Sequence, residues 1–195
     1  MSRNGRKTRP KWSDVKPRVR SLEAAELVNL IRDLYRLSED NRSFLHARFG
    51  IGEDPLAPYK AIIEASLYPD VMRDRPIRIR DAERAISHYS RAVDTSPGLL
   101  ELMVYFVEEG NAFAVDFVDI GEPFYEALLR MYDKAIACLL KQDSTIIRSY
   151  LPRLRAIVDS SSDIGWGYHD ALSDLYGRYL SAYEDEETEQ VGGAH

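Results

Sequence analysis

Residues 96–110 read Ser-Pro-Gly-Leu-Leu-Glu-Leu-Met-Val-Tyr-Phe-Val-Glu-Glu-Gly, and this stretch decides the fold. The Ser96-Pro97 pair is a typical helix start, because serine caps helices and proline fits their first turn. From Leu99 to Glu109, apolar residues fall on nearly every side of the predicted helix. A helix that is apolar all round has to be covered on most of its surface. We therefore expect a central helix over 99–109, with Gly110 as its C-cap.

The same helical period recurs on both sides of this stretch. Apolar residues spaced three and four apart predict further helices. Their starts are expected near Ser21, Ser38, Pro55, Asp81, Glu122, either Asp143 or Ser144, and Tyr168. Pro152 lies inside one of these patterns and is expected to kink or restart the helix. Residues 111–121 alternate loosely between apolar and polar, and we expect a short helix or turn there, because no partner strand is evident.

The fold class predicted from this pattern is all-α. We expect a single domain over 21–183 in which about eight or nine helices are stacked as helical hairpins. No alternation of strands and helices occurs, which argues against a parallel α/β sheet. Repeats of about 34 or 40–47 residues are not met at consistent positions, so an irregular bundle or a short solenoid-like array is expected.

Charge separates two ends from the body of the chain. The 195 residues carry a net charge of −6, but residues 1–20 contain eight lysines and arginines against Asp14 alone. Residues 184–195 contain five acidic residues and no lysine or arginine. Both ends lack apolar periodicity, so we expect a basic disordered arm over 1–20 and an acidic disordered tail over 184–195.

Three features of the sequence predict the cellular setting: a single cysteine, no apolar core of a signal peptide and no long apolar run. Cys138 is the single cysteine and lies in an apolar run, so we expect a buried small side chain in a protein of a reducing compartment. The first twenty residues have no apolar core of a signal peptide, and no run of 18 apolar residues occurs. These features favour a cytoplasmic protein without a membrane segment.

Eight short segments together resemble a known family. They are Asp33-Leu34-Tyr35, 41–48, Tyr59-Lys60, 65–69, 80–82, 85–89, 101–108 and 119–125. Their order and spacing resemble a small bacterial family of all-helical proteins that is classified as a domain of unknown function, over about residues 22–140. The resemblance implies an all-α cytosolic protein, and it supplies no activity and no catalytic residue.

The candidate ligand-binding residues lie near the central helix. They are Tyr59, Lys60, His88, Glu108 and Glu109. The two glutamates end the central helix, where the helix dipole disfavours negative charge, so we expect them to be held by ion pairs from neighbouring helices. The expected partners are Lys60, Arg80 and Arg84. The alternative is a polar pocket for a small molecule or a metal ion.

The sequence shows no catalytic constellation. The four histidines are scattered and have no ligand spacing, so no metal site is assigned. No phosphate-binding loop and no nucleophile elbow occur. We expect neither a catalytic residue nor a cofactor, and a non-enzymatic protein is favoured.

Three functions remain open. The leading hypothesis is a protein-interaction scaffold or adaptor, with a partner face or self-association through the last helix; its candidate residues are Tyr168, Tyr176, Tyr179 and Tyr183. For these rings themselves, core packing against the preceding helix is favoured, and the partner or dimer face is the alternative. The second hypothesis is a nucleic-acid-associated regulator that uses the basic arm; its candidate residues are Arg3, Arg6, Lys7, Arg9 and Lys11. The third is the small-molecule or metal-binding protein described above.

Overall fold

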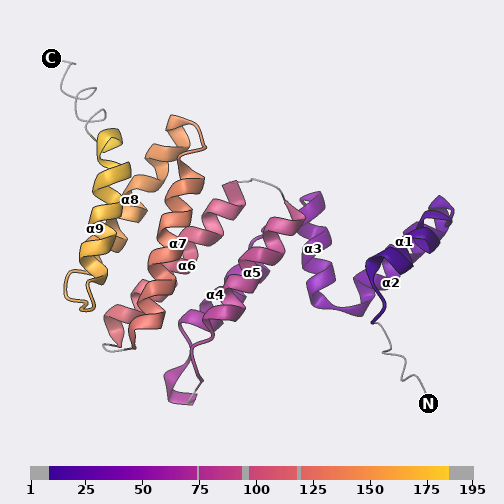
Figure 1. Cartoon of the computed structure of the whole chain (residues 1–195), viewed down its shortest axis with the longest axis horizontal. Coiled ribbons are helices and arrows are strands. Elements are labelled where there is room, and N and C mark those ends of the chain that lie inside the picture. Colours follow the sequence, from indigo (N-terminus) through magenta and orange to yellow (C-terminus); the bar gives the residue numbers. More distant parts are fainter. Residues whose placement is uncertain (1–8, 74, 94–96, 118–119, 185–195) are drawn as a thin grey trace, which may run out of the picture. The chain divides into compact units, whose positions relative to one another are not determined.

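Every regular element in the computed structural model is helical, within the residues that it describes, 9–73, 75–93, 97–117 and 120–184 (Figure 1). The α-helices are α1 (Trp12–Arg20), α2 (Ala24–Leu37), α3 (Glu39–Phe49), α4 (Ala57–Leu67), α5 (Ile79–Ala92), α6 (Pro97–Asp116), α7 (Glu122–Leu139), α8 (Ser144–Ser160) and α9 (Tyr168–Tyr179), and one 3₁₀ turn covers Val71–Arg73. The prediction of an all-α fold is confirmed. Within these ranges no helix is both long and apolar enough to cross a bilayer.

The chain divides into two compact units, Met1–Leu45 and His46–His195. We call them unit 1 and unit 2. Unit 1 holds α1, α2 and the start of α3, and unit 2 holds the remaining helices.

Helix α6 is the centre of unit 2. It packs against α4, α5, α7 and α8, and neighbours in the chain pair as α4 with α5, α6 with α7 and α8 with α9 (Figure 1). Seven apolar side chains of α6 are buried: Leu100, Leu102, Val104, Phe106, Val107, Phe113 and Ala114. The predicted central helix and the stacking of neighbouring helices are therefore confirmed.

Gly110 does not end the central helix, which continues to Asp116. The predicted C-cap was wrong because this glycine serves a close approach between helices instead. A Cβ built on Gly110 would lie 2.3 Å from Leu128 Cδ2 of α7. The missing side chain lets α7 pack closely on α6, and the helical part of the predicted turn, 111–116, simply extends α6. Residues 118–119 lie outside the described residues.

Two other local predictions can be compared with the structure. Asp143 caps α8 as expected, because its Oδ1 accepts hydrogen bonds from the N–H groups of Thr145 and Ile146. Pro152 lies inside α8, which continues through it without a restart. Cys138 is buried, as predicted.

The structure differs from the expected arm over Trp12–Arg20, which form helix α1. A local carboxylate starts this helix, because Asp14 Oδ2 accepts the backbone N–H of Lys11 at 2.8 Å. Residues 1–8 and 185–195 lie outside the described residues, so the rest of the arm and the acidic tail stay predictions.

Gly110→Ala should lower the free energy of unfolding by about 1–3 kcal/mol, because the added methyl overpacks the contact with Leu128. The matched control is Gly177→Ala in α9, where an added Cβ meets nothing within 4 Å. There the better helix propensity of alanine should raise stability by up to about 1 kcal/mol. Urea denaturation measures both changes. Equal stabilisation by the two substitutions would contradict the close α6–α7 approach.

Candidate functional site

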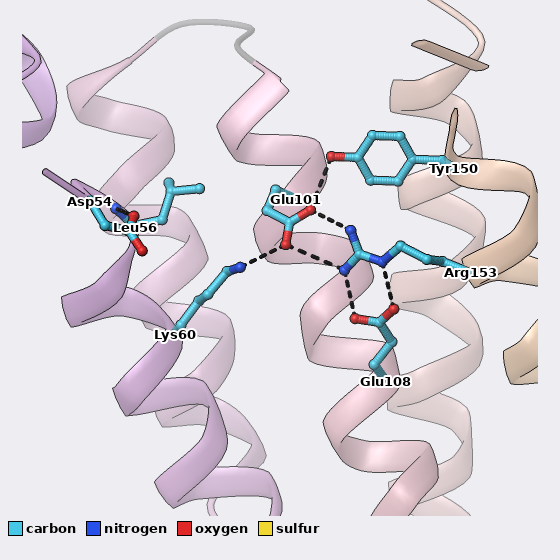
Figure 2. A network of polar contacts seen from close by, with 7 residues as sticks. All are labelled: Asp54, Leu56, Lys60, Glu101, Glu108, Tyr150 and Arg153. Carbon is cyan, nitrogen blue, oxygen red and sulfur yellow. Dashed lines mark hydrogen bonds and ion pairs between the residues drawn. The ribbon is translucent and has the colours of Figure 1, made fainter. Parts of the chain in front are cut away.

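A network of charged side chains joins α4, α6 and α8 inside unit 2 (Figure 2). Glu101 and Glu108 lie seven residues apart and therefore on one face of α6. Arg153 of α8 lies between them. Its Nε and Nη2 donate to Glu108 at 2.7 and 2.6 Å, and its Nη1 and Nη2 donate to Glu101 at 2.5 and 3.3 Å. One guanidinium thus connects two carboxylates that are two turns apart.

Two further side chains complete the environment of Glu101. Lys60 Nζ of α4 donates to Glu101 Oε1 at 2.7 Å, and Tyr150 Oη of α8 donates to Oε2 at 3.0 Å (Figure 2). Lys60 also lies 5.0 Å from the centre of the Tyr105 ring, a cation–π distance. Two carboxylates and two cations balance one another in this cluster.

The network fixes the charge state of its members. Burial alone would raise the pKa of Glu101, but hydrogen bonds from Arg153, Lys60 and Tyr150 outweigh it and lower this pKa to about 2. Burial and the neighbouring Glu101 carboxylate raise the pKa of Tyr150 to about 12. The pKa of Arg153 is raised, chiefly by its hydrogen bonds to Glu108. Near neutral pH, Glu101 is therefore ionised and Tyr150 is protonated.

The expected ion pairing of Glu108 is present, but its partner was not predicted. Of the expected cations, Lys60 joins the network through Glu101, whereas Arg84 pairs with Asp81 of its own helix at 3.2 Å. The missing partner, Arg153, follows a proline in the sequence and sits between buried positions of α8. Arg148 and Arg155 lie on the same helix, so no feature of the sequence singles out Arg153 as the partner.

The five predicted ligand-binding residues do not form one site. Lys60 and Glu108 meet in the network, through Glu101 and Arg153. Tyr59 is buried and packs edge-on against Tyr89, with ring centres 5.3 Å apart. His88 lies half-buried on α5. Glu109 accepts a hydrogen bond from Tyr105, and burial together with the charges of Glu64 and Glu108 raises the pKa of Glu109.

A groove of about 510 Å³ lies beside the network, between α6 and α8. Its lining residues recur at helical spacing on one face of each helix; they are Glu108, Asn111, Ala112, Val115, Asp116, Pro152, Arg153, Ala156, Ile157 and Ser160. This volume is in the usual range of small-molecule sites. The sequence does not predict this groove, because the groove depends on how α6 and α8, which are separated by α7 in the chain, pack together.

The four tyrosines of the C-terminal region separate into two pairs. Tyr168 and Tyr176 are buried in unit 2, where the Tyr168 ring packs on Tyr125 at 5.3 Å. Their rings therefore pack in the core, as the sequence favoured. Tyr179 is exposed and Tyr183 half-buried, so the interface prediction remains untested for this pair.

The predicted nucleic-acid arm is only partly described. Arg9 and Lys11 are exposed just before α1, whereas Arg3, Arg6 and Lys7 lie outside the described residues. Four basic residues continue this charge from Lys11 into α1, at Lys11, Lys16, Arg18 and Arg20.

Helix α2 of unit 1 has an apolar face that is open to solvent. Its exposed large side chains are Val28, Leu30, Ile31, Leu34 and Leu37, and α2 has no buried residue. Leu27 lies on the same stripe and is half-buried. On the preceding helix α1, Trp12 and Val15 are also exposed. We call the five α2 side chains the apolar face of α2.

In the described part of the chain, no three His, Cys, Asp or Glu side chains converge in a way that could hold a metal ion. Comparison of the sequence and fold with protein-family models, curated proteins and solved structures gives no match. The resemblance to a bacterial family thus remains a prediction.

Arg153→Met should lower the free energy of unfolding by about 2 kcal/mol, because Glu101 and Glu108 then face each other without their shared counter-ion. Breaking a buried pair costs about 3–5 kcal/mol, and the Arg153 side chain is 34% exposed, which reduces the cost. Arg130→Met is the matched control, because its pair with Glu126 is solvent-exposed on α7 and should contribute at most about 0.5 kcal/mol. Chemical denaturation at pH 7 compares the two, and an equal loss would refute the structural role of the network.

The network also predicts a specific pH dependence of stability. The pKa of Glu101 is about 2 in the folded chain against an ordinary 4.5, so its stabilisation is present above pH 4.5 and is lost as the pH falls towards 2. Glu101→Gln should therefore be less stable than the wild type at pH 7, and this difference should shrink between pH 4.5 and 2. Glu126→Gln, at an exposed position of α7, should show no such convergence. Denaturation curves across this pH range make the comparison, and a constant Glu101→Gln deficit would contradict the assignment.

Proposed function

We propose that the protein is a non-enzymatic interaction module, a scaffold or adaptor that binds an acidic amphipathic helix of a partner protein on the apolar face of α2. The observation that carries this proposal is the exposure of that face. Five large aliphatic side chains lie on a 14-residue helix with no buried residue.

Such a face has a physical cost in water. Apolar surface favours burial by about 25 cal/mol per Å². Contiguous apolar patches on soluble proteins mark binding surfaces for other macromolecules. Spacing of three and four residues between Leu27, Leu30, Ile31 and Leu34 suits a partner helix that lies along α2 and buries its own apolar stripe there.

The charge that precedes α2 in the sequence indicates the partner's chemistry. Residues 9–20 contain five lysines and arginines against Asp14. A partner helix with acidic flanks would be attracted to this charge as it approaches. A second copy of the chain would bring the same basic segment, and like charges disfavour that pairing. An acidic partner is therefore favoured over self-association at α2.

The test uses the full chain and two labelled synthetic helical peptides of 18 residues. Both carry leucines at helical spacing; the remaining positions are glutamate in one peptide and lysine in the other. Fluorescence anisotropy should show saturable binding of the acidic peptide and at least tenfold weaker binding of the basic one. The double variant Ile31→Ser/Leu34→Ser should weaken binding of the acidic peptide at least tenfold, because it removes apolar contact area.

Asn29→Ser/Asp33→Ser, on the polar face of the same helix, is the matched control and should change affinity less than twofold. A single-stranded oligonucleotide of similar charge serves as the second control. The proposal fails if the two double variants weaken binding equally, if the acidic peptide does not bind, or if the oligonucleotide competes fully with the peptide.

A further inference from the structure

The groove between α6 and α8 contains a buried acceptor without a donor. Asn111 is 4% exposed, and its Nδ2 donates to Ser160 Oγ at 2.8 Å. The amide reaches the wall of the groove, because Asn111 and Ser160 both line it. Asn111 Oδ1 is buried and has no hydrogen-bond partner among the described residues.

The orientation of this amide follows from the hydroxyl group that it meets. Ser160 Oγ lies 2.7 Å from the carbonyl of Ala156 and 3.2 Å from that of Ile157, so its one proton is donated within α8. Ser160 can then only accept from Asn111, which places Nδ2 towards Ser160. Asn111 Oδ1 is then the amide atom that has no donor in the described part of the chain. An unpaired buried acceptor of this kind costs about 1–3 kcal/mol and calls for a donor from outside.

The remaining polar groups of the groove are acceptors as well. Glu108 and Asp116 contribute carboxylates, and Asp116 Oδ2 already accepts a hydrogen bond from Tyr68. Arg153 directs four hydrogen bonds to Glu101 and Glu108, which leaves one of its five N–H groups. An anion entering here would meet two carboxylates and little free donor capacity. The groove therefore suits a cation that donates hydrogen bonds.

The spacing of the acceptors indicates the shape of that cation. Glu108, Asn111 and Asp116 follow one face of α6, and the outer two are about 12 Å apart along the helix axis at 1.5 Å per residue. Apolar walls lie between and opposite them, at Ala112, Val115, Pro152, Ala156 and Ile157. Methylene groups can pack on these walls while nitrogen atoms reach the acceptors.

We propose that this groove binds a linear aliphatic diamine or triamine, with its two or three ammonium groups at acceptors among Glu108, Asn111 and Asp116. The volume of about 510 Å³ is in the range of small-molecule sites. The proposal is independent of the peptide site proposed on α2, because no residue is shared between the two.

The test is isothermal titration calorimetry on the full chain at 150 mM salt. The probes are spermidine, 1,5-diaminopentane and the uncharged 1,5-pentanediol. We expect saturable one-to-one binding of at least one amine and no binding of the diol. Asp116→Asn and Asn111→Leu should each lower the affinity for the amine at least fivefold. Asp116 is exposed, and asparagine keeps an acceptor for Tyr68, so this variant folds even where Asn111→Leu does not.

Two controls separate the groove from general attraction of amines to an acidic protein. Asp133→Asn removes the same charge from an exposed site on α7 and should change affinity less than twofold. Ala112→Phe fills the groove without a change of charge and should abolish binding. Equal weakening by Asp133→Asn, unchanged binding in Ala112→Phe, or no saturable binding of either amine would overturn the proposal.

The last arm of the experiment addresses a second source of ammonium groups. A hexalysine peptide presents the same chemistry on side chains. Binding of this peptide at least tenfold tighter than that of the triamine, with the same sensitivity to Ala112→Phe, would overturn the small-molecule assignment in favour of a basic protein segment. Weaker binding of the peptide than of the triamine is the expected result.

Discussion

Unit 2 depends on the burial of α6, whose apolar side chains point in nearly every direction. No single neighbour can cover such a helix, and α4, α5, α7 and α8 share the task. The same arrangement brings Glu101 and Glu108 under neighbouring helices as well. Two carboxylates removed from water need counter-ions, and Arg153 of α8 and Lys60 of α4 supply them. The ion-pair network is thus a consequence of how the central helix is covered.

The groove follows from the same packing. Arg153 ties α8 to α6 at Glu108, while the α8 residues further along the same face are small or short, at Ala156 and Ser160. Small residues on both helices, including Ala112, leave space that a larger pair of side chains would fill. Asn111 borders this space. Its Nδ2 has a hydrogen-bond partner, whereas its buried Oδ1 has none within the ranges that the structure describes. A well-packed core seldom leaves such a group, and its position beside an open volume is the basis of the proposed amine site.

The sequence predicted those features that depend on local chemistry. The burial of Leu99–Glu109 follows from composition and period, and the Asp143 cap follows from one carboxylate near two free N–H groups. The prediction for Gly110 was wrong because the sequence around a glycine that ends a helix does not differ from that around a glycine that allows another helix to pack closely. Only Leu128, 18 positions along the chain, distinguishes the two. Arg153 and the groove were missed for the same reason, since pairings between distant helices leave no periodic signal.

Helices α6 and α2 differ in how their apolar side chains are covered. Over 99–109, helix α6 is apolar on nearly every side and obtains its cover from its own unit. Helix α2 is apolar on one side only, and charged residues occupy its other side, at Glu26, Arg32, Asp33 and Arg36. This division suits a helix that is wet on one side and meets another surface on the other. Because no residue of α2 is buried, the energy available from its apolar face is still to be gained on binding, and a partner helix with matching spacing and acidic flanks can gain it.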